Sequence, residues 1–496
     1  MSGQQVCAAS CSRMPLPGAA PPHLRAPLII LLGALAGCTA RVTSISPTTV
    51  AAAGPSFKLT VLGSGFSGSS AVQWNGASRS TTYVSATELL AQINSADIAS
   101  PGSASITVNN PGVTSSSAST ASNAETMNVV SQSIDATAFQ IDPAHDGAMT
   151  FTSTVSFPSA PAWTVNLGAG TPSNMVIADS RVFLTTGTSG GSQLIALNQS
   201  NGSTSWGPSA ITGVTGGSAG VAYDGGRVFV AEGQFGSSTV YAYDANTGAL
   251  DWSTGLNAAT PGAPTAADGF VYVVATGNAT LYALDESTGT IAWQQPLSAA
   301  GGTPAVTADG VYVTSTTSGC HTTDLRPATG ETIWNSSNGS SFCPQTADGT
   351  PAVANQLVYS PDSSGAAIFA AETGSSSGTL SYSPPGAFTS TTAFLPRSPN
   401  LDAISLSGNS VQWTFNGDNG LDVPPIVVKD PSNQYVITGS SLGNLFAINA
   451  TSGSSVWTKT VGGKVVQLAA GDGLLLAVSE TGNGTGTLTA YTISAQ

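Results

Sequence analysis

The stretch LYALDESTGTIAW, residues 281–293, decides the fold because near copies of it recur along the chain. Each copy has a hydrophobic segment, a turn of the form Asp/Asn-x-x-x-Gly, and a Trp a few residues later. The other copies are VYAYDANTGALDW at 240–252, LIALNQSNGSTSW at 194–206, LFAINATSGSSVW at 445–457 and a more divergent TTDLRPATGETIW at 322–334. Such a fixed period predicts a repeat architecture.

The spacing of the repeats predicts an all-β fold. The aromatic residues that close the repeats are Trp163, Trp206, Trp252, Trp293, Trp334, Tyr382, Trp413 and Trp457. One four-stranded blade of a β-propeller takes about 40–45 residues, which is close to most of these intervals. Apolar residues alternate with polar ones within each unit, as in strands, and the last strand of a unit is expected to end at its Trp.

Ring closure predicts the number of blades. The tail after Trp457 offers three strands, at 465–470, 474–478 and 487–493. The segment 148–163 then supplies the missing fourth strand, which gives an eight-bladed β-propeller without free sheet edges. Seven blades remain the alternative, because the unit from Tyr382 to Trp413 is short.

The repeated residues have predictable structural roles. The turn glycines, such as Gly248 and Gly289, are expected to adopt the left-handed conformation. The Asp or Asn that starts each turn can accept hydrogen bonds from the turn's own backbone. Trp163, Trp206, Trp252, Trp293, Trp334, Trp413 and Trp457 are structural repeat residues, each a large apolar plate that bridges one blade to the next.

The repeat resembles the PQQ-like, or tryptophan-docking, repeat of quinoprotein-type propellers. The stretch GFVYVVATGNATLYALDESTGTIAW at 269–293 carries the resemblance, which extends from about residue 140 to the C-terminus. The resemblance implies a propeller over 140–496. It implies little about function, because enzymes and non-enzymes share the repeat.

The N-terminus predicts export and lipidation. Residues 26–37, APLIILLGALAG, are too short to span a membrane and follow Arg25, as in a signal peptide. They lead into LAGC, which resembles the bacterial lipobox, so residues 1–37 are the predicted lipoprotein signal peptide and Cys38 the lipidation site. Met14 is an alternative start. Thr39 follows Cys38 in place of the Asp that resembles an inner-membrane retention signal, so we expect a lipid anchor in the outer membrane.

Two cysteines are left for a disulfide. Cys7 and Cys11 lie in or before the predicted signal peptide, and Cys38 is the predicted anchor. Cys320 and Cys343 flank the turn before Trp334, and an exported protein is free to form disulfides. We expect these two residues to pair, with two free thiols as the alternative.

A second module precedes the propeller. Residues 42–130 show short alternating strands separated by Pro, Gly and Ser, as in an immunoglobulin-like β-sandwich. The segment resembles the IPT/TIG domain through Ile45-Ser-Pro, GSGF at 63–66 and VQWNG at 72–76. Residues 131–139 are the predicted linker, short enough to make the sandwich a stalk for the propeller.

Composition and motifs argue against several functions. The net charge is −14, and loss of residues 1–37 would make it −16, so we expect no nucleic-acid partner. His145 and His321 lie in no triad context, and the Asp418–Asp422 stretch lacks calcium-loop spacing. We therefore predict no catalytic residue and no metal site.

Three functions are compatible with these features. The first is a non-enzymatic, lipid-anchored and monomeric envelope protein without cofactors. It resembles the lipoprotein of the outer-membrane β-barrel assembly machinery and would bind a protein partner through its propeller. The second is a quinoprotein oxidoreductase that uses PQQ and calcium, but the vicinal cysteine pair common in that family is missing. The third is a carbohydrate-binding or adhesin-type surface module.

Overall fold

The protein consists of strands joined by turns. The computed structural model describes residues 40–52, 56–111, 121–130, 135–170, 172–188, 191–211, 220–234, 237–256, 262–298, 300–316, 318–344, 349–381, 385–482 and 484–495. Cys7, Cys11, Cys38 and Tyr382 lie outside these ranges. Within them the helical structure is one 3-10 turn, η1 (Ser95–Ile98), and no helix is long and apolar enough to cross a membrane.

The N-terminal sandwich has two sheets. One sheet has the order β1-β3-β7-β6, with β1 (Arg41–Ser46), β3 (Phe57–Ser64), β7 (Glu88–Ile93) and β6 (Thr81–Ser85). The other has the order β2-β9-β8-β4-β5, with β2 (Thr49–Ala51), β9 (Glu125–Val130), β8 (Gly102–Asn109), β4 (Ala71–Trp74) and β5 (Ala77–Ser78). Phe57, Leu59 and Val61 alternate along β3 and lie in the core between the sheets, as does Trp74.

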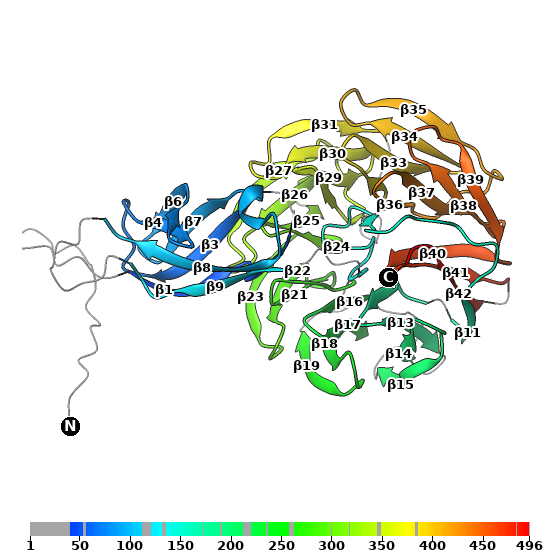
Figure 1. The fold of residues 1–496 in the computed structure, drawn as a ribbon, viewed down its shortest axis with the longest axis horizontal. Helices are drawn as coiled ribbons and strands as arrows, with labels where there is room; N and C mark the ends of the chain where they lie inside the picture. Colours follow the sequence, from blue (N-terminus) through cyan, green and yellow to red (C-terminus); the bar gives the residue numbers. More distant parts are fainter. Residues whose placement is uncertain are drawn as a thin grey trace, which may run out of the picture.

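Eight further sheets form the propeller-like body, and Figure 1 shows them arranged around a common centre with the sandwich at one side. Six of them consist of four consecutive antiparallel strands. Their strands are β12 (Val176–Ala178), β13 (Arg181–Thr188), β14 (Gly191–Asn198) and β15 (Thr204–Ile211); β16 (Val221–Asp224), β17 (Arg227–Gln234), β18 (Ser237–Asp244) and β19 (Leu250–Leu256); β20 (Thr265–Ala267), β21 (Phe270–Ala275), β22 (Thr280–Asp285) and β23 (Ile291–Pro296); β24 (Ala300–Val306), β25 (Val311–Thr316), β26 (Cys320–Leu325) and β27 (Thr332–Ser337); β28 (Ala352–Ala354), β29 (Leu357–Asp362), β30 (Gly365–Ala370) and β31 (Ser376–Leu380); β32 (Ala387–Phe388), β33 (Thr392–Arg397), β34 (Asn400–Ser405) and β35 (Ser410–Phe415).

The last two sheets each take up a strand from the N-terminal side. In one, β10 (Ala148–Thr150) pairs in parallel with β36 (Ile426–Lys429), beside β37 (Gln434–Gly439), β38 (Asn444–Asn449) and β39 (Ser455–Thr460). In the other, β11 (Trp163–Ala169) pairs with β42 (Thr485–Thr492), beside β41 (Leu474–Glu480) and β40 (Lys464–Gly471). The first and last parts of the propeller-like body therefore meet in these two sheets.

Two details of the predicted strands are wrong. The segment 148–163 was expected to complete the C-terminal sheet, but the strand that does so starts at Trp163, and Ala148–Thr150 pairs with the neighbouring sheet. The last strand of a unit was expected to end at its Trp, yet β19 continues four residues past Trp252. The reason is that the Trp side chain leaves the strand face toward the next sheet while the backbone keeps pairing.

The core lies between neighbouring sheets. Val271 and Val273 of β21 pack with Phe229 of β17 and Val240 of β18 in one cluster. Strands such as β21 and β22 are buried on both faces over most of their length. Only contact with the sheets on either side can cover both faces of such strands, so each unit depends on its neighbours for stability.

Candidate functional site

The centre of the propeller-like body is occupied by residues 135–150, which we call the axial segment. Its carbonyl oxygens accept hydrogen bonds of 2.7–2.9 Å from backbone amides of six innermost strands, β12, β16, β24, β28, β32 and β36. The acceptor and donor residues are Ala136 with Ile177, Thr137 with Tyr223, Pro143 with Val306, Ala144 with Val353, Asp146 with Phe388, and Gly147 with Val427. The second half of the predicted linker, 135–139, thus lies within the body.

Side-chain hydrogen bonds also fix the axial segment in place. The amide nitrogen of Gln140 donates to the carbonyl oxygens of Gly386 (3.0 Å) and Pro425 (3.4 Å), and the side chain is buried. Gln140 and Ile141 both have positive φ, at 51° and 80°. This backbone conformation is unfavourable for non-glycine residues and is maintained here by the surrounding contacts.

Three titratable groups of the axial segment have shifted pKa values. His145 is 2% exposed, and burial lowers its pKa to about 4, although its Nδ1 lies 3.3 Å from the carbonyl oxygen of Pro351. Desolvation raises the pKa of Asp142 to about 6, against the effect of nearby backbone amides. Desolvation and the neighbouring Asp142 raise the pKa of Asp146. The imidazole is therefore neutral near pH 7.

The cavity beside the axial segment is small. It has a volume of about 50 Å³ and is lined by Phe139, Gln140, Met175, Val423 and Gln467, among others. Sites for cofactors and other small molecules usually measure about 300–1,000 Å³. This cavity holds a few water molecules at most.

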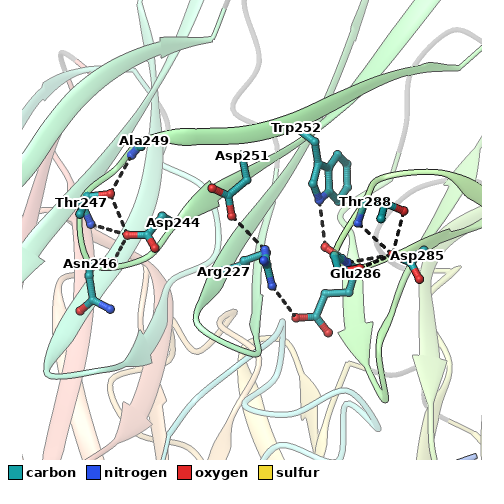
Figure 2. A network of polar contacts seen from close by, with 11 residues as sticks. Arg227, Asp244, Asn246, Thr247, Ala249, Asp251, Trp252, Asp285, Glu286 and Thr288 are labelled. Atoms are coloured by element: carbon teal, nitrogen blue, oxygen red, sulfur yellow. Dashed lines mark hydrogen bonds and ion pairs between the residues drawn. The ribbon is translucent and has the colours of Figure 1, made fainter.

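A second polar cluster lies between the sheet β16–β19 and the sheet β20–β23. Figure 2 shows Arg227 between two carboxylates, with its Nε 2.9 Å from Asp251 and its Nη1 3.8 Å from Glu286. Desolvation, then Asp224, raises the pKa of Glu286 to about 7, while Arg227 opposes the rise. Desolvation, then Asp224 and Glu286, raises the pKa of Asp268 to about 7.

Perturbed carboxyl groups of this kind are candidates for acid–base chemistry. Here they also have a structural use, because Glu286 reaches across the sheet boundary and lies against the bare Cα of Gly225. In the described part of the chain, no three His, Cys, Asp or Glu residues are grouped so as to hold a metal ion. The cluster is most simply a polar contact between two sheets.

The repeat tryptophans join successive sheets. Each indole N–H donates to a backbone carbonyl oxygen on the far side of a sheet boundary at 2.7–3.1 Å. The donors and acceptors are Trp163 with Gln199, Trp206 with Ala245, Trp252 with Glu286, Trp293 with Pro327, Trp334 with Ala371, Trp413 with Ala450, and Trp457 with Pro158.

The turns of the repeat have the expected geometry. Gly248 and Gly289 adopt left-handed conformations, both with φ 71°. The Oδ1 of Asp244 accepts hydrogen bonds from the amides of Asn246 and Thr247, and Asp285 does the same in the next repeat (Figure 2). The structure adds a reason for glycine: a Cβ on Gly289 would lie 2.5 Å from the ring of Trp252.

The predicted disulfide is present. Cys320 and Cys343 are bonded at an S–S distance of 2.00 Å, and both are fully buried. The bond ties the start of β26 to the loop after β27. The predicted lipidation site, Cys38, lies outside the described residues, so the anchor stays a prediction.

Sequence reasoning missed the axial segment and the role of Glu286. The sequence predicts only that His145 lies in no catalytic triad and that residues 131–139 form a linker. One signal was available: the stretch FQIDPAHDGAM at 139–149 follows no repeat and carries polar residues between apolar ones. Its bonding is through the backbone, which residue types do not reveal.

Comparisons with known families identify both modules. Residues 209–414 match the family model described as outer membrane protein assembly factor BamB, and residues 40–125 match the IPT/TIG domain. The chain therefore carries a PQQ-like propeller behind an IPT/TIG domain. No curated protein matches the chain significantly.

Solved structures of two kinds share the fold. BamB from Moraxella catarrhalis is 20% identical with a TM-score of 0.51, and the match covers 68% of this chain and 100% of that chain. A europium-containing methanol dehydrogenase is 10% identical with a TM-score of 0.56, covering 72% and 98%. The quinohemoprotein alcohol dehydrogenase ADHIIG from Pseudomonas putida HK5 is 14% identical with a TM-score of 0.55, covering 73% and 81%. At these identities the similarity concerns the fold alone.

Proposed function

We propose that the protein is a non-catalytic, lipid-anchored scaffold of the bacterial outer membrane that binds a protein partner through its propeller. The main observation behind this proposal is that the axial segment fills the centre of the propeller-like body. The axial segment makes backbone bonds to six sheets where a central ligand would otherwise sit, and the cavity beside it has a volume of about 50 Å³.

The residues at the axis do not fit a calcium-bound quinone. Such a group needs a cluster of carboxylate ligands and basic partners for its own carboxylates, but Asp142 and Asp146 have raised pKa values and no described Lys or Arg forms an ion pair with them. The disulfide joins residues 23 positions apart and is not vicinal. The family match to an assembly factor supports the same proposal.

We further propose that the eight sheets are blades of one closed ring. Tryptophan bonds join seven successive pairs of sheets, including the pair formed by the C-terminal sheet and the sheet that starts with β12. At the remaining boundary the rings of Tyr359 and Phe388 stack at 4.4 Å. β11 closes the last sheet from the N-terminal side, which removes a free edge within that sheet.

The scaffold proposal is tested by site-specific crosslinking in cells that express the full chain. A photoreactive residue would replace Phe342, which is 51% exposed beside the disulfide. A matched probe at Glu331, on the opposite ends of the same strands, is the control. Crosslinking of an outer-membrane barrel-assembly protein at position 342 and not at 331 supports the proposal; recovery of polysaccharide alone contradicts it.

The enzyme alternative is tested on the purified chain. Incubation with PQQ, calcium and a series of alcohols should give no alcohol-dependent reduction of a dye. Saturable PQQ binding together with dye reduction would overturn the proposal. The anchor is tested by membrane fractionation, in which Cys38→Ala should release the protein from the outer membrane.

A further inference from the structure

The sandwich touches the propeller-like body at places where the repeat departs from its own pattern. Four repeats start their turn with Asn or Asp, at Asn198, Asp244, Asp285 and Asn449. In the divergent repeat this position is Arg326, and in the next repeat it is Ala370. These two repeats supply the sheets β24–β27 and β28–β31, which carry the contacts to the sandwich.

The replacement of the turn carboxylate has a local cost. In the regular repeat, Asp244 accepts three hydrogen bonds from the backbone and hydroxyl groups of its turn. Arg326 has no acceptor atoms in its side chain, so its turn lacks the side-chain bonds that Asp244 accepts, while Thr329 and Gly330 still donate to the backbone oxygen of Arg326. A position that breaks a local rule in this way commonly serves another contact.

That contact is an ion pair with the sandwich. The Nη1 of Arg326 lies 3.2 Å from Glu88 of β7, and the two side chains are only 17% and 12% exposed. Glu331 lies 3.2 Å from the Nε of the same guanidinium and is largely exposed. Because the Arg326–Glu88 pair is largely removed from water, loss of one partner would leave a poorly solvated charge.

Two further contacts surround the ion pair. The backbone amide of Lys58, in β3, donates to the carboxylate of Asp309 in the turn between β24 and β25. The ammonium of Lys58 pairs with Glu372 in the turn between β30 and β31. Ala308 packs against the apolar core of the sandwich. The interface thus involves two strands of the sandwich and two neighbouring sheets of the body. Figure 1 shows the sandwich beside the body.

We propose that this surface is a specific intramolecular docking site, in which Arg326 and Lys58 hold the outer face of β3 and β7 on the turns of two sheets and fix the sandwich in one orientation. The sandwich is then a rigid part of the body and not a freely moving stalk. Cys320 and Arg326 lie at opposite ends of β26, so the disulfide side points away from the docked sandwich. If the proposed scaffold function holds, that side is the one presented to a partner; the docking itself does not depend on that function.

The test measures the distance between sandwich and body in the purified full chain in detergent. Spin-labelled unnatural amino acids would replace Tyr83 on the sandwich and Leu250 on the body, which are 43% and 53% exposed. The native disulfide remains untouched. We expect one narrow distance distribution for the parent, and a distribution at least twofold broader for Arg326→Glu and for Glu88→Arg. The double exchange should narrow it again.

Lys464→Glu is the matched control, since Lys464, the first residue of β40, pairs with Asp422 at 3.0 Å. It reverses a charge without touching the sandwich and should leave the distribution unchanged. Glu88→Gln provides a milder variant, checked for folding by circular dichroism, if a reversed charge prevents folding. Unchanged widths in the single variants, or a double exchange as broad as the singles, would overturn the proposal, whether or not a partner binds the disulfide side.

Discussion

The contact between the turn glycine and the tryptophan predicts that two otherwise similar glycine substitutions lower the free energy of unfolding by different amounts. Gly289 and Gly269 lie in turns of the same sheet, with φ of 71° and 83°. A Cβ on Gly289 would meet the Trp252 ring at 2.5 Å, whereas a Cβ on Gly269 would meet nothing within 4 Å. Alanine is strained by the left-handed backbone at both positions, but only at Gly289 must a neighbouring side chain move.

The magnitudes follow from these two effects. Left-handed strain costs about 1–2 kcal/mol for a residue with a Cβ. Displacing a packed ring adds about 1–3 kcal/mol. We therefore expect Gly269→Ala to lower the free energy of unfolding by about 1–2 kcal/mol and Gly289→Ala by about 2–5 kcal/mol.

Urea titration followed by circular dichroism and tryptophan fluorescence measures both variants. A Trp252→Ala background removes the ring and leaves the Thr254 Oγ1, 2.9 Å from the Cβ position, so in that background the extra cost of Gly289→Ala over Gly269→Ala should become much smaller. The reasoning is refuted if the two glycine variants are equally stable with Trp252 in place, or if the difference in stability is undiminished after Trp252 is removed.

Three other outcomes are expected. Reduction of the disulfide, or Cys320→Ala with Cys343→Ala, should lower the free energy of unfolding by about 3 kcal/mol, measured by urea titration with and without reductant. The folded-state pKa of Glu286, raised from 4.5 to about 7, means that the folded state binds the proton more tightly than the unfolded chain. The stability that this group contributes is fully present below about pH 4.5 and is lost as the pH rises toward 7. In the variant Glu286→Gln, the urea midpoint should therefore depend less on pH over this range. An unaltered dependence on pH would contradict the assignment. In the axial segment, Gly147→Ala would place a Cβ 2.9 Å from the carbonyl oxygen of Gly386 at φ 69°, and thermal unfolding should begin several degrees lower than in the open-turn variant Gly269→Ala.

The structure separates two kinds of polar group that look alike in the sequence. Asp285 and Glu286 are neighbours, but Asp285 bonds its own turn and has a lowered pKa, mainly through Ser287 and Thr288 acting against desolvation. Glu286 points across the sheet boundary, where desolvation raises its pKa. One side chain therefore shapes a turn, and the next joins two sheets.

The sequence by itself determined the repeating parts of this protein. The period of the Trp, the Gly at each turn and the alternation of apolar residues predicted an all-β propeller-like fold. The disulfide was predicted because Cys320 and Cys343 are the two cysteines left after the predicted signal peptide and anchor. These features are local or periodic: residue types report directly on turn conformation, strand faces and the aromatic plate that each unit needs.

Only the tertiary structure decided what fills the centre and where the sandwich rests. Gly147 and Val427 meet through backbone atoms, and every residue offers the same backbone donor and acceptor, so no residue type marks such a pairing. In the sequence, Arg326 is only a departure from the repeat, whereas the structure shows that its side chain pairs with Glu88. A departure from a periodic pattern shows that a position is used differently, while the partner that explains it is brought close only by the folded chain.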